Sequence, residues 1–350
     1  MSREVLTVET PHPAIRIVYD FVTPQEELYL VQKIDAVGGG PALAAADQAA
    51  GEEGEGASRG GDGGTSSASG NDEDQAVDAG HSTVDRSAKS WGWKELNGRR
   101  CVCFPCFRGK TRSPGRCTGA GGTVLPNSHS LVPAPFPAFM DGQWPDVLGR
   151  IAETGVFDEL KAEGADLKGK GKERGANHCL VNEYLPSQGI LPHTDGPAYH
   201  PLTATLSLSS HTILSLRSPP SWLSSPSPST TSASQKASDA KEVEKVDVFL
   251  PARSLVLLSG KLYEEWLHGI QPLEVSEPES LRGCANWEQY WDSRLAACEG
   301  EEAKEEVRKE RGNVEEKGWK REKRISLTCR KVKGKVRKGL AVGLLGGGKR

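Results

Sequence analysis

Apolar and polar residues alternate along most of the patterned parts of this chain, as they do in β-strands. Residues 14–22 alternate in this way, and in residues 24–34 the apolar positions recur at helical spacing. A strand leading into a helix is therefore predicted near the N-terminus. Further β-type runs, separated by Pro, Gly and Ser, are CLVNEYL, TATLSLSSHTILSL, DVFLP, SLVLLSG and RISLTCRKV, at residues 179–185, 203–216, 247–251, 254–260 and 324–332.

Many short strands with no helices between them favour an all-β core. We predict a mainly β fold with flanking helices, built on a double-stranded β-helix, or jelly roll, with one or two N-terminal helices packed outside it. The patterned blocks together amount to one domain's worth of chain. We therefore expect a single discontinuous domain over residues 1–38 and 86–350.

Four segments depart from this pattern. Between residues 47 and 78 there are nine Asp or Glu against the single Arg59, with almost no large apolar residue, which predicts disorder. A Ser/Pro-rich stretch and a charged stretch of helical composition with little apolar stripe are interpreted as excursions from the core. The four segments are an acidic Gly-rich insertion at 39–85, a Ser/Pro-rich loop insertion at 218–245, a charged insertion at 299–320 and a basic tail at 334–350.

The formal net charge of −3 hides an asymmetry between the C-terminus and the rest of the chain. Residues 317–350 carry thirteen Lys or Arg against the single Glu322. Two interpretations stand: a region that attracts phosphate backbones through counterion release, and a solvated chain end. The strings KREKR and KVKGKVRK are compatible with nuclear import, so we expect the nucleus and/or the cytoplasm as the location.

Membrane and secretory signals are missing from the pattern. No run approaches the roughly 18 to 20 apolar residues of a membrane span, and the first residues carry acids and a Pro where a signal peptide needs an apolar stretch. We expect a soluble, non-secreted chain with no membrane partner, whose eight Cys are free thiols. Cys101, Cys103, Cys106 and Cys117 lie in a short span, but C-x-C-x2-C lacks paired C-x2-C knuckles, so zinc binding stays open.

His193 and Asp195, in GILPHTDGP, form an H-x-D pair between a strand-like run and a Gly-Pro turn. In an extended segment, residues i and i+2 point to the same side, so an imidazole and a carboxylate can converge on one ion. One H-x-D is weak evidence alone. His268, which follows the apolar run SLVLLSG, would complete the two-His, one-carboxylate triad of non-haem Fe(II) oxygenases. The alternative is a surface His before a Gly.

Arg324 and Arg330 stand six residues apart in RISLTCR. On a strand this even spacing puts both guanidiniums on one face, while Ile325, Leu327 and Cys329 make the other face apolar. Burying the cationic face is costly unless anions pair with it, and a dicarboxylate suits bidentate Arg contacts. The alternative is that both arginines belong to the basic tail.

Asn182 and Tyr184, in LVNEYLP, complete a set that is recognisable as a whole. The order N-x-Y, H-x-D, distal His and R-x5-R resembles the AlkB-like family of Fe(II)- and 2-oxoglutarate-dependent dioxygenases, and is most similar to the group of the sixth animal AlkB homologue. The resemblance covers discontinuous blocks, about half of the chain. The insertions have no counterpart in it.

The resemblance implies Fe(II) ligation by His193, Asp195 and His268, with 2-oxoglutarate and O2 as cosubstrates. It further implies that 2-oxoglutarate is bound by four residues, one Arg pairing with the distal carboxylate and the other lying near the metal. Ser326 stands where the bacterial archetype has an Asn, which implies a reshaped pocket. The four implied 2-oxoglutarate residues are Asn182, Tyr184, Arg324 and Arg330.

The resemblance also implies a function, oxidative dealkylation (demethylation) of nucleic acid bases. A single-stranded or flipped base would be needed to reach a buried iron. Two alternatives are the same chemistry on a protein side chain and a non-catalytic nucleic-acid-binding jelly roll. We take a monomer as the default oligomeric state.

Two pairs of residues bear on substrate binding. Tyr199 and His200 would either stack on a base or pack on the barrel rim. Arg99 and Arg100, near the aromatic Trp93, would either contact phosphate or lie at a strand end in water. The sequence leaves both alternatives open.

Overall fold

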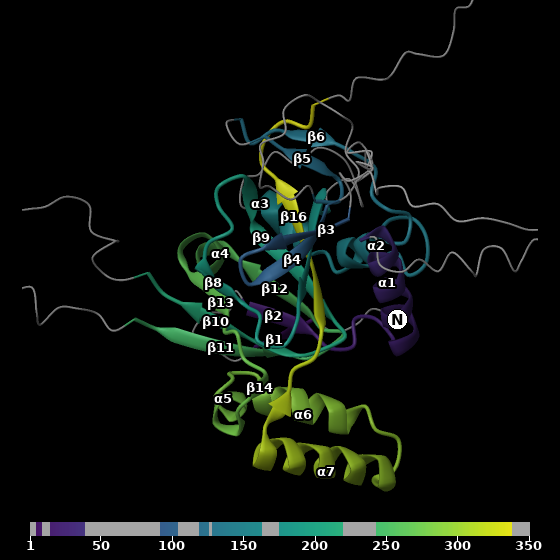
Figure 1. Ribbon diagram of the computed structural model, residues 1–350, viewed down its shortest axis with the longest axis vertical. Coiled ribbons are helices and arrows are strands. Elements are labelled where there is room, and N and C mark those ends of the chain that lie inside the picture. Colours follow the sequence, from purple (N-terminus) through teal and green to yellow (C-terminus); the bar gives the residue numbers. More distant parts are fainter. Residues whose placement is uncertain are drawn as a thin grey trace, which may run out of the picture.

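The computed structural model describes residues 5–8, 15–38, 92–103, 119–125, 128–162, 175–219 and 243–337 (Figure 1). The acidic insertion expected at residues 39–85 lies outside the described residues. So do residues 220–242 of the Ser/Pro-rich segment and 338–350 of the basic tail.

A large antiparallel sheet of eight strands is the first of two sheets that form the body of the protein. Its strands come from both ends of the chain, since β16 near the C-terminus lies between β9 and β7. In spatial order, its strands are β1 (Leu6–Thr7), β2 (Ile15–Val18), β12 (Leu255–Ser259), β9 (Tyr199–Leu208), β16 (Arg324–Val332), β7 (His178–Tyr184), β4 (Arg99–Cys103) and β3 (Gly92–Leu96).

A second sheet of four strands lies against it, and an apolar cluster joins the two. That cluster combines residues of the large sheet, such as Ile17 and Val256, with residues of the small sheet, such as Leu216 and Val248. This arrangement confirms the predicted mainly β jelly-roll core. The strands of the small sheet, in spatial order, are β11 (Lys245–Leu250), β10 (Thr212–Arg217), β13 (Leu267–Ile270) and β8 (Ile190–His193). Two further ladders pair β5 (Gly122–Val124) with β6 (Leu131–Pro133) and β14 (Val275–Ser276) with β15 (Trp319–Lys320).

Helices cover the outer face of the large sheet. Helix α1 (Pro24–Val37) begins at a capping box, in which Thr23 Oγ1 accepts from the Glu26 N–H and the Glu26 carboxylate accepts from the Thr23 N–H. Leu30 and Ile34 of α1 are fully buried in a cluster with the sheet. Helices α2 (Val147–Glu153) and α3 (Glu159–Ala162), joined by a 3₁₀ turn (Val156–Asp158), complete this layer. The predicted N-terminal strand and helix are therefore confirmed.

Strand β16 separates an apolar outer face from a polar inner face of the large sheet. Ile325, Leu327 and Cys329 are fully buried in the cluster beneath the helices, as their alternation predicts. The opposite face carries Arg324 and Arg330, both buried. On the neighbouring strands the residues that share this inner face are also mostly polar, so the interior has an apolar half near β2 and β12 and a polar half near β9, β16 and β7.

A layer of aromatic residues covers the outer face of the small sheet. Helices α5 (Pro278–Arg282), α6 (Trp287–Ala296) and α7 (Glu301–Lys317) lie together below the sheets in Figure 1. Phe249 of β11 packs with Trp287 and Tyr290 of α6 in this cluster. We expected residues 299–320 to be a peripheral excursion, but α7 buries Val307 and Val314 in the same cluster. Two apolar residues seven positions apart lie on one face of a helix, and here they pack an otherwise charged helix against the aromatic cluster.

A one-turn helix, α4 (Gly260–Glu265), separates β12 from His268, where the sequence predicted no intervening helix. Its apolar residues Leu262 and Tyr263 are buried. His268 consequently lies within a strand of its own, β13, rather than just beyond the buried strand. None of the helices in the described ranges is long and apolar enough to cross a membrane.

The cysteines correct one expectation. Cys179, Cys284, Cys298 and Cys329 are free thiols, as expected, but Cys101 is disulfide-bonded. A disulfide sulfur is not a thiolate, so Cys101 offers no zinc ligand in this state. Cys106 and Cys117 lie outside the described residues.

Asn286 holds the aromatic layer to the small sheet, and its loss should destabilise the fold. Its buried side chain accepts from the Phe249 N–H (2.7 Å) and donates to the Phe249 carbonyl (2.8 Å). Asn286→Ala leaves both backbone groups buried without partners, so we expect a loss of about 3 kcal/mol in the free energy of unfolding. Urea denaturation measures this. The control is Lys309→Ala, which removes an exposed ion pair with Glu306 and should cost less than about 0.5 kcal/mol. Equal losses in the two variants would contradict the account.

Candidate functional site

His193, Asp195 and His268 converge beside the edge of the small sheet, where strand β8 ends. His193 ends β8 and lies directly opposite His268 on the adjacent strand β13. The imidazole rings are 4.4 Å apart, and His268 Nε2 lies 3.9 Å from Asp195 Oδ1. One potential ligand atom from each of the three residues lies within 4.8 Å of the others. The sequence motif and the strand pairing thus place all three side chains around one point.

Each of the two imidazoles has a ring nitrogen that can bind a metal through its lone pair. His193 Nδ1 lies 2.8 Å from the Leu191 carbonyl, which can only accept, so Nδ1 carries the proton and Nε2 is left as the ligand atom. Burial lowers the pKa of His268 to about 4, although the Asp195 carboxylate acts in the opposite direction. His268 is therefore neutral at neutral pH and needs to release no proton to bind a cation.

Asp195 supplies the negative charge of this group. Its Oδ1 lies 3.2 Å from Arg330 Nη1, and its buried Oδ2 has no hydrogen-bond partner among the described residues. A buried acceptor without a partner is costly, so a ligand at Oδ2 would be stabilising. Two imidazoles and one carboxylate are the donor set of a facial triad for a divalent iron. The residues present therefore fit such an ion.

Arg324 is a buried guanidinium that forms no ion pair with the described residues. Only its Nη2 is satisfied by a side chain, donating to Ser207 Oγ at 2.8 Å, while Nε and Nη1 lack partners within the described part of the chain. The guanidinium also lies over the Tyr184 ring, 5.5 Å from its centre. Burial, reinforced by the nearby Arg321 charge, lowers the pKa of Arg324 to about 10 despite the opposing effect of Tyr184. These unsatisfied N–H groups of the guanidinium are donors for a carboxylate ligand.

Arg330 lies at the other end of the same strand face, beside the triad. Besides its contact with Asp195, its guanidinium stacks on the Tyr199 ring at 4.7 Å. The sequence left open which of the two arginines is nearer the metal-ligand residues. The contact with Asp195 shows that Arg330 is the arginine nearer the triad, and Arg324 lies farther from it.

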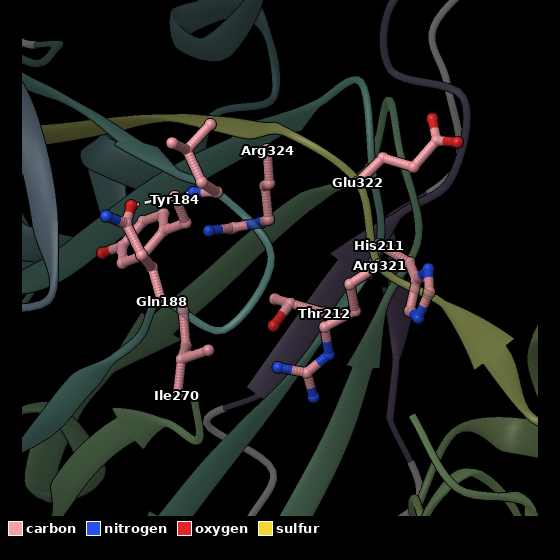
Figure 2. Close-up of a pocket in the computed structure, with 9 residues that line it drawn as sticks. Tyr184, Gln188, His211, Thr212, Ile270, Arg321, Glu322 and Arg324 are labelled. Atoms are coloured by element: carbon pink, nitrogen blue, oxygen red, sulfur yellow. Dashed lines mark hydrogen bonds between the residues drawn. The ribbon is translucent and has the colours of Figure 1, made fainter. Parts of the chain in front are cut away.

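A pocket opens beside Arg324 (Figure 2). Arg324 and Thr212 point into it, with Tyr184, Gln188 and Ile270 around it. The triad does not line this pocket, so the pocket marks the distal end of the polar inner face. His211, which also borders it, is buried and bonded to Ser276 Oγ at 3.0 Å, consistent with a structural role rather than a metal ligand.

Asn182 and Tyr184 share the inner face of β7, as their spacing predicts. In the ladder with β16, Asn182 lies opposite Ser326 and Tyr184 opposite Arg324. Asn182 Oδ1 accepts a hydrogen bond from Arg99 Nε at 3.2 Å. Burial raises the pKa of Tyr184, so its phenol stays protonated and can donate. Tyr184 therefore lies at the Arg324 end of the face, and Asn182 lies between that end and Arg330.

The structure shows the surroundings of three residues that the sequence analysis considered for substrate binding. Tyr199 packs beneath Arg330, and its hydroxyl lies 3.3 Å from His178 Nδ1, which favours packing over base stacking. Arg100 forms a bidentate ion pair with the fully buried Glu183, at 2.5 and 2.9 Å, and stacks on Trp93. It is therefore held by a buried carboxylate and is not free at a solvated strand end. His200 is partly buried, and burial together with Lys333 and Lys331 lowers its pKa.

Two residues near the site were not singled out from the sequence. Ser207 bonds Arg324, and the alternation in TATLSLSS, which puts Ser207 on the polar face, is the signal that would have identified it. Tyr263 of α4 has a buried hydroxyl with no partner in the described ranges, and its pKa is raised by burial and by Asp195. No local pattern marks Tyr263, because α4 itself was not predicted.

Comparisons with known proteins agree with the motifs. Residues 127–330 match the family model described as the 2OG-Fe(II) oxygenase superfamily. The chain is 38% identical over 100 residues to the "Probable RNA/DNA demethylase ALKBH6" of Danio rerio, covering 27% of this chain and 37% of that protein. The chain thus matches little more than a third of that relative's length.

Two solved structures are also similar to the chain, though distantly. The structure of OsALKBH1 matches 94% of this chain and all of its own, with a TM-score of 0.39 and 12% identity. A Pseudomonas putida prolyl-4-hydroxylase matches 44% of this chain and 48% of its own, with a TM-score of 0.20 and 16% identity. At these scores neither bears on the assignment of the site.

Proposed function

The chain belongs to the 2OG-Fe(II) oxygenase superfamily, and from this premise we propose that it removes alkyl groups, above all methyl groups, oxidatively from nucleic acid bases. The convergence of His193, Asp195 and His268 on the face that also carries the buried Arg324, two of whose nitrogens lack partners among the described residues, is the observation that carries the proposal.

The general chemistry follows from membership of the family. The protein is a 2-oxoglutarate-dependent non-haem iron dioxygenase, and its expected cofactors, Fe(II), 2-oxoglutarate and O2, are confirmed by the family match. The AlkB-like resemblance is confirmed by the same match together with the Danio rerio relative.

We assign Fe(II) to His193, Asp195 and His268. Support comes from the neutral state of His268, the free lone pair of His193 Nε2 and the unsatisfied Asp195 Oδ2. Arg330 lies 3.2 Å from Asp195 Oδ1 and so orients the carboxylate.

We assign the distal carboxylate of 2-oxoglutarate to Arg324. Its unsatisfied N–H groups are donors for that carboxylate, and the protonated phenol of Tyr184, whose ring lies under the guanidinium, is a further donor. Arg330, beside Asp195, and Asn182, between the two arginines, would face the end of the cosubstrate that lies near the metal. The cosubstrate is a dianion, which suits a face that carries more guanidiniums than carboxylates.

When bound, Fe(II) and 2-oxoglutarate supply the oxidising chemistry: with O2, 2-oxoglutarate becomes succinate and CO2 while a substrate C–H bond is hydroxylated, and a hydroxylated N-methyl group leaves as formaldehyde. The chain's own contribution is to orient the metal ligands, neutralise the cosubstrate charge and keep bulk water out. The Asp195 side chain is only 6% exposed and that of His268 16% exposed. A base must therefore be unpaired or flipped to reach the triad.

A nucleic acid partner, single-stranded or with a flipped base, is supported by the name of the Danio rerio relative, a probable RNA/DNA demethylase, and by the basic C-terminal region. We further propose a nuclear and/or cytoplasmic location and no membrane partner, on the basis of the motifs KREKR and KVKGKVRK and the absence of an apolar span in the sequence.

Arg324→Ala should weaken cosubstrate use strongly. The substitution leaves a buried carboxylate without its guanidinium, which costs about 3–4 kcal/mol, and so raises the KM for 2-oxoglutarate roughly 100- to 1,000-fold. Steady-state succinate production at varied 2-oxoglutarate measures it. Arg311→Ala, which removes ion pairs with Glu288 and Glu315 on the outer helices α6 and α7, is the control and should leave the KM unchanged. An unchanged KM in Arg324→Ala would refute the assignment.

The substrate class is tested by comparing matched methylated substrates. We expect formaldehyde and succinate from an N-methylated single-stranded oligonucleotide, much less from its duplex form and none from a methylated peptide. Asp195→Ala should abolish turnover, with an unchanged far-ultraviolet circular dichroism spectrum. Turnover of the peptide alone would replace the nucleic acid by a protein substrate, while succinate formation with neither would leave the oxygenase assignment intact and the substrate proposal wrong.

A further inference from the structure

Arg99 lies on the inner face of the large sheet, among the residues assigned to the cosubstrate. In the ladder between β4 and β7, Arg100 is paired with Glu183 and Cys101 with Asn182. Because side chains alternate along a strand, Arg99 and Cys101 share the face of Asn182, whereas Arg100 points to the opposite face. The two neighbouring arginines that the sequence treated as a pair therefore have different surroundings.

The contact between Arg99 and Asn182 fixes the orientation of the Asn182 amide. Arg99 Nε donates to Asn182 Oδ1 at 3.2 Å, and Asn182 is only 5% exposed. A guanidinium has donors and no acceptor, so a flipped amide would set N–H groups against N–H groups. Arg99 thereby holds the amide oxygen on its own side and leaves both amide N–H groups directed away from it.

The charge of Arg99 also reaches the Arg324 end of the inner face. Burial raises the pKa of Tyr184, and the nearby charges of Arg324 and then Arg99 oppose that rise. Arg99 is therefore a third guanidinium, with Arg324 and Arg330, that acts on the inner face. The metal-ligand residue Asp195 lies close to Arg330, with which it is paired.

We propose that Arg99 is a positioning residue for 2-oxoglutarate, which holds the Asn182 amide so that its N–H groups are presented to the cosubstrate. This inference rests on the proposed function, because it takes Asn182 as a cosubstrate-binding residue. Arg99 acts through Asn182 and not on the metal, so its loss lowers cosubstrate affinity and leaves metal affinity unchanged.

Arg100 provides a matched control from the adjacent position. It pairs with the fully buried Glu183 and stacks on Trp93, 4.4 Å from the ring centre, both away from the inner face. Removing Arg100 leaves the Glu183 charge buried and unpaired, which lowers the stability of the fold. Arg99→Ala and Arg100→Ala are thus expected to separate cosubstrate affinity from stability.

The experiment is calorimetric titration of the full chain, first with Mn(II) as a redox-inert substitute for Fe(II), and then of the Mn(II)-loaded protein with 2-oxoglutarate. We expect Arg99→Ala to raise the Kd for 2-oxoglutarate about tenfold, Arg99→Lys to raise it less because it keeps a donor, and both to keep the wild-type Kd for Mn(II). Arg100→Ala should lower the Tm and change the Kd for 2-oxoglutarate less than about twofold.

A double variant tests whether Arg99 acts through Asn182. If it does, Arg99→Ala/Asn182→Ala binds 2-oxoglutarate no more weakly than Asn182→Ala alone. A full additional tenfold loss in the double variant, or a wild-type Kd in both Arg99→Ala and Arg99→Lys, overturns the inference. If Arg99→Ala does not fold, the Kd of Arg99→Lys decides alone. Failure of the wild-type, Mn(II)-loaded protein to bind 2-oxoglutarate would refute the proposed function itself, and with it the premise of this inference.

Discussion

The burial of Arg324 and Arg330 on one face of a single strand is the constraint on which the rest of the structure depends. A buried guanidinium costs several kcal/mol unless anions and acceptors surround it. Arg330 has Asp195 as its anion, whereas Arg324 has only the Ser207 hydroxyl and the Tyr184 ring, and two of its nitrogens are unsatisfied within the described residues. The fold thus maintains a cationic interior, and we propose that a dicarboxylate completes it.

The layers around this strand make its burial possible. On the outer face, Ile325, Leu327 and Cys329 anchor β16 against the layer of α1 to α3, so the apolar half of the strand offsets the cost of its polar half. On the other side, the small sheet brings His193 and His268 into direct register. Helices α5 to α7 then cover that sheet through the aromatic cluster around Phe249. The two histidines and the arginines are consequently held by strands of two sheets, and Asp195 follows the end of β8 by two residues.

Much of this organisation could be predicted from the sequence, because it depends on side chains that alternate between the two faces of a strand. The alternation in RISLTCRKV places Arg324 and Arg330 on one face, and the i, i+2 spacing places His193 beside Asp195 and Asn182 beside Tyr184. What could not be predicted depends on pairing between distant strands. The order of the two arginines relative to the triad requires the contact with Asp195, and the difference between Arg99 and Arg100 requires the register of β4 against β7. Helix α7 was underestimated because only two apolar residues dock it, and the turn of α4 is too short to give a helical period.

The central claim is that one polar interior holds Fe(II) and 2-oxoglutarate together, through the triad at one end and Arg324 at the other. The most direct measurement is an anaerobic titration of the purified protein with Fe(II) and then 2-oxoglutarate, followed by visible absorption, in the wild type and in His268→Ala. The account predicts a weak visible band that appears only when both are present and is absent in the folded variant. No band in folded wild-type protein, or an undiminished band in His268→Ala, would contradict it.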